Sequence, residues 1–298
     1  MKPETSLKMV SDNNNILVSI IIPVFNAERF IAPCIHSLTA QTLQETEIIC
    51  IDDGSTDSSP QLLDQLASIH SNIRVIHQTN RGQGAARNRG VRTARGKYIG
   101  FVDADDIVAP GMYEHLYQII TDNQADIAVC RAYNIDESGN DIRELTMWNS
   151  FPDGLYNSDK ISETDFFNNE CSPVLWDKLI SRPIASRFMS TDLRRGQDFI
   201  TLIDYISAVS RIVFTTRRMY YYRHHPASVM ATPESSKTIS EDFKTEKIAV
   251  EKIKSHWGNK PIAQLYIKRI KEEWTLRLEK YTPLPEIRAD IESFLRTL

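Results

Sequence analysis

The chain has 298 residues, of which 41% are hydrophobic and 25% are charged, so it can bury the core of one large or two modest domains. Its formal net charge of −4 argues against general nucleic-acid binding, and we expect no nucleic-acid partner. The four cysteines, at positions 34, 50, 130 and 171, are widely spaced and form no Cys-x-x-Cys pair. This spacing excludes a standard zinc motif and a disulfide framework, and it is typical of a reducing compartment.

Residues 1–15 are polar, rich in Asn and without periodicity, so we expect them to be disordered. They lack the apolar centre of a signal peptide. The longest apolar stretch, Leu17 to Phe25, has nine residues and is too short to span a bilayer. We therefore expect a cytoplasmic protein, with peripheral contact at the inner face of the cell membrane left open.

The next part of the chain alternates between apolar strands and amphipathic helices. VSIIIPVFN (18–26) is β-branched and apolar, which predicts a buried parallel strand stopped by Pro23 and Asn26. Further strands are expected at 46–53, 73–78, 97–106 and 125–132, with helices at 29–41, 58–70 and 84–94. This alternation predicts an α/β fold with an open, mostly parallel sheet and helices on both faces.

Two groups of aspartates follow predicted strands. Asp52 and Asp53 end one strand, and Asp103, Asp105 and Asp106 end another. In open parallel sheets, ligands bind beyond the carboxyl ends of the strands. We therefore expect both groups at one ligand-binding edge of the sheet.

The pattern changes after about residue 135. The segment 136–175 is polar and rich in turns, a helix is expected at 196–210, and a strand-like run at 211–225 ends in a basic, His-containing turn. Two helices are expected within 241–281, broken at 258–261. We divide the chain at these changes into 1–15, 16–135, 136–235 and a helical C-terminal region at 236–298.

Asp103 and Asp105 form an Asp-x-Asp pair. If the strand continues to Asp105, the two side chains point to the same side. Hard oxygen ligands of this kind suit Mg²⁺ or Mn²⁺, which also take ligands from substrate phosphates. The alternative is a solvated turn, with Asp106 capping the segment that follows.

For other candidate residues as well, a purely structural interpretation stands beside the functional one. Asp52 either accepts a hydrogen bond from a nucleotide base or only stabilises the turn after it. In NRGQGAARNRGVRTARG (80–96), glycines before a helix start, together with arginines, suit a phosphate neighbourhood. Arg87, in the first turn, is the candidate, whereas Arg92 and Arg95 are expected on a solvated face.

Several stretches resemble the family-2 glycosyltransferases of the GT-A (Rossmann-like) fold, in that family's order and spacing. They are VSIIIPVFNAE, EIICIDDGSTD, NRGQGAARNRGVRTARGKYIGFVDADD, WDKL, QDF and YRHHPASV. The resemblance is strong over 18–130 and patchy to about 230. It implies transfer of a sugar, with inversion and a divalent cation (Mn²⁺ or Mg²⁺), from a UDP-sugar to a saccharide or lipid-linked acceptor. The segment 16–135 would then bind the nucleotide-sugar, and 136–235 the acceptor.

The resemblance also assigns roles to individual residues. The residues that would contact the nucleotide are Pro23, Val24, Phe25, Glu28, Asp52, Arg87 and Asp103. Phe25 stands where the family often has Tyr, so a hydroxyl contact would be missing.

In the same way, Asp105 and His225 would bind the metal, and Trp176 and Lys178 would border the acceptor or sugar. Asp198 would be the catalytic base, which takes the proton of the acceptor hydroxyl. Gln197 replaces a Glu that usually precedes this residue. Without the resemblance, Asp198 would be interpreted as a residue of the first helical turn whose negative charge is stabilised by the helix dipole.

The C-terminal segment 262–281 carries one apolar stripe with basic flanks. The stripe consists of Ile262, Tyr266, Ile270, Trp274 and Leu278. Such a helix either lies on an anionic membrane or packs on the core or on a second subunit, which leaves a homodimer open.

Two other functions remain open. A sugar nucleotidyltransferase also pairs a parallel sheet with acidic metal ligands, but usually has a glycine-rich, basic loop after the first strand, where this chain has PVFNAERF. A non-catalytic nucleotide-binding assembly subunit is supported only by Gln197.

Overall fold

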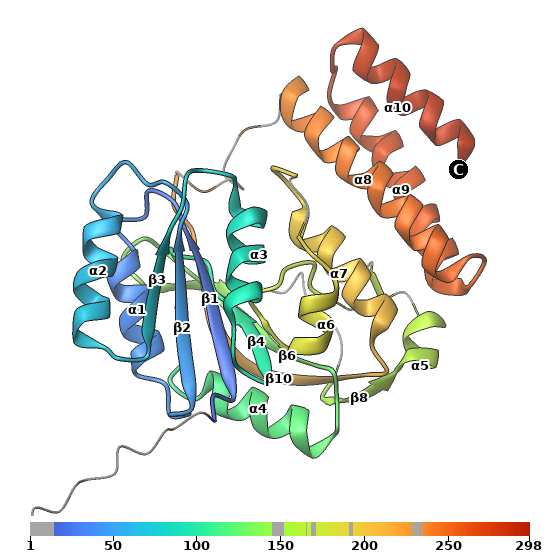
Figure 1. Ribbon diagram of the computed structural model, residues 1–298. Helices are drawn as coiled ribbons and strands as arrows, with labels where there is room; N and C mark the ends of the chain where they lie inside the picture. The colour runs from blue at the N-terminus through green and yellow to red at the C-terminus, as the bar shows by residue number, and fades with distance from the viewer. Residues whose placement is uncertain are drawn as a thin grey trace, which may run out of the picture.

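The computed structural model describes residues 15–144, 152–164, 166–167, 171–190, 193–226, 228, 233 and 235–298. The expected N-terminal disorder falls almost entirely on residues 1–14, which lie outside this part. Within it, the chain forms one sheet flanked by helices, with three further helices at the C-terminus (Figure 1).

The strands of the sheet are β1 (Val18–Val24), β2 (Thr46–Asp52), β3 (Ile73–His77), β4 (Tyr98–Phe101), β5 (Ile107–Val108), β6 (Ile127–Ile135), β7 (Asp141–Glu144), β8 (Gly154–Asn157), β9 (Lys178–Ser181) and β10 (Arg211–Arg223). The helices are α1 (Ile31–Thr39), α2 (Ser59–Ile69), α3 (Gln83–Thr93), α4 (Met112–Asp122), α5 (Ser158–Ser162), α6 (Arg182–Arg187), α7 (Gln197–Ala208), α8 (Ser236–Trp257), α9 (Pro261–Lys280) and α10 (Pro285–Thr297).

The strand order is β3-β2-β1-β4-β9-β6-β10-β5, with β7 paired to β6 and β8 to β10. The strands that share one direction are β1, β2, β3, β4, β6 and β10. The expected fold class, an open and mostly parallel α/β sheet with a helical C-terminal extension, is therefore confirmed. The sheet runs continuously through the segments 16–135 and 136–235.

Strand alternation divides the core between the two faces of the sheet. All seven residues of β1 are buried. Ile20 and Ile22 belong to a cluster with the apolar residues of α1, α2 and α4, whereas Ile21 belongs to a cluster that includes α3 and α7. Figure 1 shows α1 and α2 on one side of the first strands and α3 on the other. Successive side chains of a strand point to opposite faces, so a strand covered on both sides is apolar throughout.

The four cysteines are free and buried, so the expectation of no disulfide framework is confirmed. Burial raises the pKa of Cys50 and of Cys171 to about 12, which keeps these thiols protonated. They act as small apolar residues of the core.

The C-terminal helices are packed within the chain. Helix α8 lies against α7 and α9. Every residue of the apolar stripe on α9 is buried, with Leu278 the most exposed at 8%. Packing on the core is thus confirmed for this stripe, and the structure gives no support to membrane contact through its apolar side chains, because they are already covered. None of the helices that the structure describes combines the length and apolar character that a bilayer crossing requires.

Candidate active site at the carboxyl edge of the sheet

The two aspartate groups lie at the same edge of the sheet. Asp52 is the last residue of β2, and Asp103 comes two residues after β4 ends. Strand β1 lies between β2 and β4 and is parallel to both, so their carboxyl ends point the same way. The expected meeting of the two groups at one edge is confirmed.

The Asp-x-Asp pair nevertheless lies in a turn and not in a strand. Strand β4 ends at Phe101, and residues 104–105 form a turn before β5. The predicted strand at 97–106 is therefore too long, and alternation along a strand does not place Asp103 and Asp105 on one side. Contacts with other elements determine where these two side chains point.

Strand β10 holds this turn in place. Asp106 is 1% exposed, and its carboxylate accepts hydrogen bonds from the hydroxyl of Tyr220 (2.6 Å) and from the backbone N–H of Arg223 (2.7 Å). The Arg223 side chain donates from Nε to the carbonyl of Asp105 at 2.7 Å. Asp106 therefore fixes the turn instead of capping a helix. Sequence reasoning missed Arg223, because nothing local shows that a residue far along the chain returns to this turn.

Arg87 joins two of the predicted site residues. Its guanidinium is 1% exposed and donates to Oδ1 of Asp103 at 3.0 Å and to Oδ1 of Asp198. Asp198 also accepts the backbone N–H of Leu175 at 3.4 Å. Helices α3 and α7 thus bring the proposed base and the first residue of the Asp-x-Asp pair together through a single cation.

The charge at this site is only partly balanced. Burial, together with the negative charges of Asp198 and Asp105, raises the pKa of Asp103 to about 6, although Arg87 opposes the shift. The same burial would lower the pKa of Arg87, but Asp198 and Asp103 raise it, so the guanidinium stays charged. An additional positive charge at this edge would relieve the repulsion among the aspartates.

Asp105 and His225, the two residues predicted to bind a metal, face each other. Nε2 of His225 lies 2.8 Å from Oδ2 of Asp105, and the imidazole packs on the ring of Phe30 with centroids 4.8 Å apart. The described residues contain no group of three or more His, Cys, Asp or Glu that could hold a metal ion. Two protein ligands suit Mg²⁺ or Mn²⁺ if water and diphosphate oxygens complete the coordination.

Gln197 belongs to a chain of amides that ends on Asp103. Its Nε2 donates to Oε1 of Gln83, and Nε2 of Gln83 donates to Oδ1 of Asp103 at 3.0 Å. Gln197 therefore points toward α3 and adds no charge beside Asp198. Gln83 is a second residue that the sequence analysis missed.

The other acidic residues near the expected nucleotide pocket also stabilise loops. Asp52 accepts the N–H of Ser55 at 3.0 Å and lies 2.9 Å from Nδ1 of His77, whose pKa it raises. Glu28 accepts the N–H of Ser58 at 2.9 Å. Both have lone pairs left for a ligand. Next to them, Phe25 is 52% exposed, whereas Pro23 and Val24 are buried in β1.

Trp176 and Lys178 are buried behind the edge. The Trp176 ring stacks on Tyr220 with centroids 4.2 Å apart. Lys178 is 0% exposed, and its Nζ donates to the carbonyls of Ser172 and Val174 and to Asp177, at 2.7–2.8 Å. The structure gives no support to direct contact between Lys178 and an acceptor, since its three donors are used within the protein.

At this edge, an acidic turn follows the fourth strand, and Asp198 faces it across the buried Arg87. The chain belongs to glycosyltransferase family 2, because the family model "Glycosyl transferase family 2" matches residues 19–179.

Among curated relatives, the glycosyltransferase GlyG of Streptococcus pneumoniae is 34% identical over 221 residues, which are 72% of this chain and 73% of GlyG. A poly(ribitol-phosphate) β-glucosyltransferase of Bacillus spizizenii is 40% identical over 126 residues, or 41% of this chain and 20% of that protein. The chain spans 64% of the length of each of two further bacterial relatives.

Among solved structures, Staphylococcus aureus TarS 1–349 in complex with UDP-GlcNAc superimposes with a TM-score of 0.70. The match covers 87% of this chain and 73% of that chain at 18% identity, and it therefore shows a shared fold.

Proposed function

We propose that this protein transfers a hexose or an N-acetylhexosamine from a UDP-sugar to a hydroxyl of a glycan or lipid-linked acceptor, with inversion and with Mn²⁺ or Mg²⁺, in surface polysaccharide synthesis. The observation that carries this proposal is the Arg87 bridge between Asp103 and Asp198 beside the Asp105–His225 pair. This arrangement supports a site in which donor and acceptor meet at one edge of the sheet. The relative named for poly(ribitol-phosphate) supports a surface polymer as the acceptor class.

Each residue at the edge has a defined task in this proposal. Asp198 lies at the start of α7 and takes the proton from the attacking acceptor hydroxyl, which contributes roughly 10²–10⁴-fold to the rate. Arg87 orients this carboxylate. Asp52 accepts an N–H of the base, while Pro23, Val24, Phe25 and Glu28 line its pocket.

Asp105 and His225 would hold the metal ion, with Asp103 beside it. A bound divalent ion stabilises the negative charge of the departing diphosphate. Inversion follows from attack on the sugar face opposite to the leaving group. Trp176 supports the acceptor side by holding Tyr220, which binds the acidic turn through Asp106.

The test is a screen of nucleotide sugars for transfer and for protection against thermal unfolding, with and without Mn²⁺. We expect UDP-sugars to protect, and transfer to disappear in EDTA and in Asp105→Ala. Asp290→Ala, an exposed aspartate on α10, serves as the control and should retain activity.

Three outcomes would contradict the proposal. Full activity in EDTA would show that the transfer does not require a metal ion. Release of pyrophosphate from a nucleoside triphosphate would indicate a nucleotidyltransferase. UDP binding without turnover across all donors and acceptors would indicate a non-catalytic subunit.

A further inference from the structure

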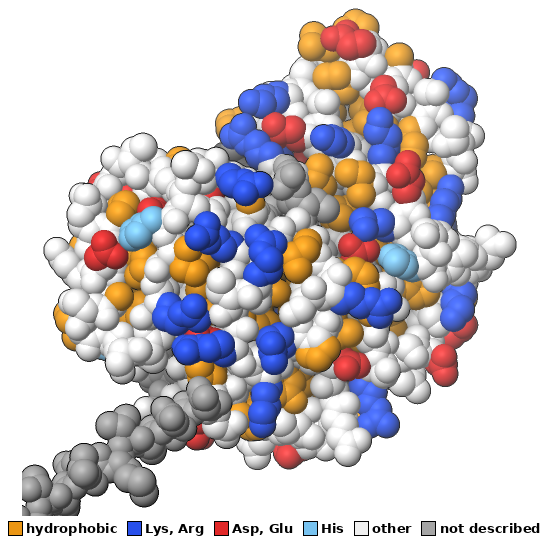
Figure 2. All heavy atoms as spheres, in the orientation of Figure 1, with side chains coloured by type: hydrophobic (Ala, Val, Ile, Leu, Met, Phe, Trp, Pro, Cys, Tyr) orange, Lys and Arg blue, Asp and Glu red, His pale blue; other side chains and the backbone are white. Residues whose placement is uncertain are grey.

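Beyond the first residue of α3, every exposed residue of this helix and of the segment that follows it, as far as residue 97, is cationic. Between residues 84 and 97, the exposed residues are Arg89, Arg92, Arg95 and Lys97. The segment 79–97 contains no Asp or Glu. Figure 2 shows Lys and Arg side chains gathered over this part of the molecule. In a chain with a net charge of −4, positive charge is therefore concentrated on one face.

Helix α6 extends this face and is fixed to α3. It contributes the exposed Arg182 and Arg187, and the segment 178–190 is also free of acidic residues. Asn88 exchanges two hydrogen bonds with the backbone of Ser190, at 2.7 and 3.0 Å, and the N–H of Arg182 donates to the carbonyl of Lys97 at 2.9 Å. These contacts fix α6 and the segment after it against α3.

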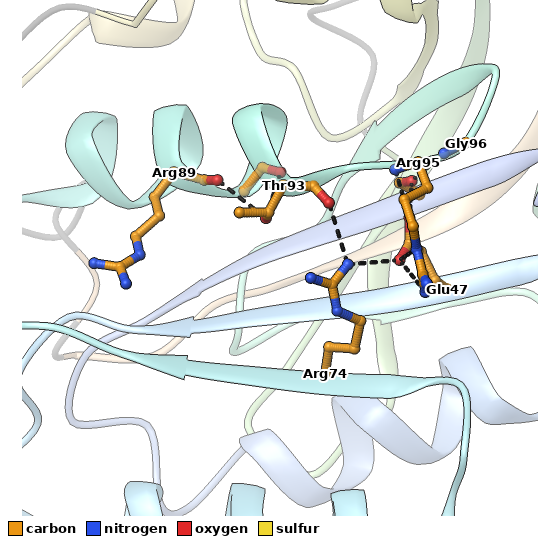
Figure 3. Close-up of polar contacts among 8 residues, drawn as sticks. Glu47, Arg74, Arg89, Thr93, Arg95 and Gly96 are labelled. Carbon is orange, nitrogen blue, oxygen red and sulfur yellow. Dashed lines mark hydrogen bonds and ion pairs between the residues drawn. The ribbon is translucent and has the colours of Figure 1, made fainter.

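Only part of this charge is neutralised within the protein. Figure 3 shows Arg74 and Arg95 converging on Glu47, whereas the Arg89 side chain extends away from them. Although burial opposes ionisation, hydrogen bonds from Ser19, Arg95 and Arg74 lower the pKa of Glu47 and keep it charged. The remaining cations make no ion pair with the described residues. We call these five, Arg89, Arg92, Lys97, Arg182 and Arg187, the α3–α6 basic face.

An apolar side chain lies among these cations. Met189, which follows α6, is 38% exposed, and its Sδ lies 3.8 Å from Nη1 of Arg92. A soluble anionic polymer has no apolar layer to contact the Met189 side chain, so this residue would add little to its binding. An anionic bilayer surface offers phosphate groups to the arginines and an apolar layer to the methionine.

We propose that the α3–α6 basic face docks on an anionic lipid bilayer. Gln83 and Arg87 of α3 lie at the carboxyl edge of the sheet, whereas Lys97 and Arg182 lie beside the start of β4 at the opposite end, so docking along this face would place the flank of the sheet on the membrane. The surface is distinct from the apolar stripe of α9, which is buried. Membrane binding of this kind does not require the proposed catalytic activity.

The experiment is co-sedimentation of the full chain with phosphatidylcholine vesicles, with and without phosphatidylglycerol. We expect binding only to the anionic vesicles, weakening as salt rises from about 0.05 M to about 0.5 M because surface charges are screened. Replacing Arg89, Arg92, Arg182 and Arg187 with Gln should lower the partition coefficient by on the order of 100-fold, since each cation near an anionic surface contributes separately.

The matched control replaces four exposed cations of the C-terminal helices, Lys254, Lys268, Lys280 and Arg296, with Gln. It makes the same change in net charge and should retain binding. The pairs Arg89→Gln/Arg92→Gln and Arg182→Gln/Arg187→Gln are tested separately, so that a folding defect in the fourfold variant does not decide the result.

The proposal is overturned if the wild type does not bind anionic vesicles, or if the control variant loses as much binding as the fourfold variant. It is also overturned if soluble polyphosphate binds this face more tightly than vesicles at equal phosphate concentration. That result would assign the face to an anionic polymer.

Discussion

At the scale of single residues, the site depends on how few cations face its carboxylates. Arg87 forms ion pairs with both Asp103 and Asp198. The side chain of Arg223 donates its hydrogen bonds to backbone carbonyls of the turn and of residues 136–137. Within the part of the chain that the structure describes, the side chain of Asp105 pairs only with the imidazole of His225. The edge therefore retains negative charge, which suits a divalent cation and a diphosphate bound together.

The residue that most directly tests the chemistry is Asp198. Asp198→Asn keeps the size of the side chain and one oxygen but removes the proton acceptor. We expect donor binding to survive while turnover falls at least about 100-fold. Calorimetry with the donor and steady-state kinetics measure the two separately. Near-normal turnover would exclude Asp198 as the base, and equal losses in binding and turnover would assign it to the donor pocket.

At the scale of elements, the C-terminal helices position the start of α7. Asp242 of α8 accepts from Nε of Arg195 at 2.6 Å and from Nη2 of Arg277 at 2.7 Å. Thr245 donates to the carbonyl of Arg195 at 2.8 Å and packs against Gly196, where φ is +69° and an added Cβ would lie 2.4 Å from the Thr245 methyl group. Asp198 follows two residues later.

We therefore expect Asp242→Asn to displace Asp198 without touching the donor. The amide nitrogen of Asn cannot accept the second guanidinium, so one of the two contacts is lost. Turnover should fall about tenfold, because small errors in the placement of reacting groups are costly, while donor affinity stays unchanged.

Asp290→Asn is the control for Asp242→Asn, since among the described residues Asp290 makes a single ion pair, with Lys247 on the surface. Both variants are assayed well below their unfolding temperatures. Unchanged turnover in Asp242→Asn, or a loss shared with Asp290→Asn, would show that α8 does not position the base.

The helices and strands also show why sequence patterns predicted only part of the structure. Strands β1, β2 and β6 are mainly apolar runs and helices α1 and α2 are amphipathic, so each was predicted within a few residues; helix α3 was placed by the glycines before it. Strand β9 has four residues and is recognisable only by its antiparallel pairing with β4 and β6. Lys178 looks like a surface residue in sequence, but its burial depends on carbonyls that only the folded chain supplies.

The site divides in the same way. Asp52, Asp103 and Asp105 were predicted because they follow strands, which is a local signal. Arg223 and Gln83 contribute to the site through contacts between segments that are distant in the chain. No local sequence pattern predicts such contacts.

At the scale of the whole molecule, stability depends on pH through a buried carboxyl group between α8 and α9. Burial raises the pKa of Glu246 from 4.5 to about 7, although the hydroxyl of Tyr266, which donates to Oε2 at 2.6 Å, opposes the shift. The folded protein therefore binds a proton that the unfolded chain releases at lower pH. This contribution to the free energy of unfolding is fully present below the unfolded pKa and is lost as pH rises through about 7.

Glu246→Gln should remove this dependence, because the amide stays neutral and its oxygen still accepts from Tyr266. Between about pH 5 and about pH 8, the wild type should lose about 2 kcal/mol of stability relative to Glu246→Gln. Urea unfolding of both proteins across this range measures the difference. Parallel pH profiles would mean that Glu246 ionises normally in the fold. A wild type that gains stability relative to the variant as pH rises would reverse the sign of the argument.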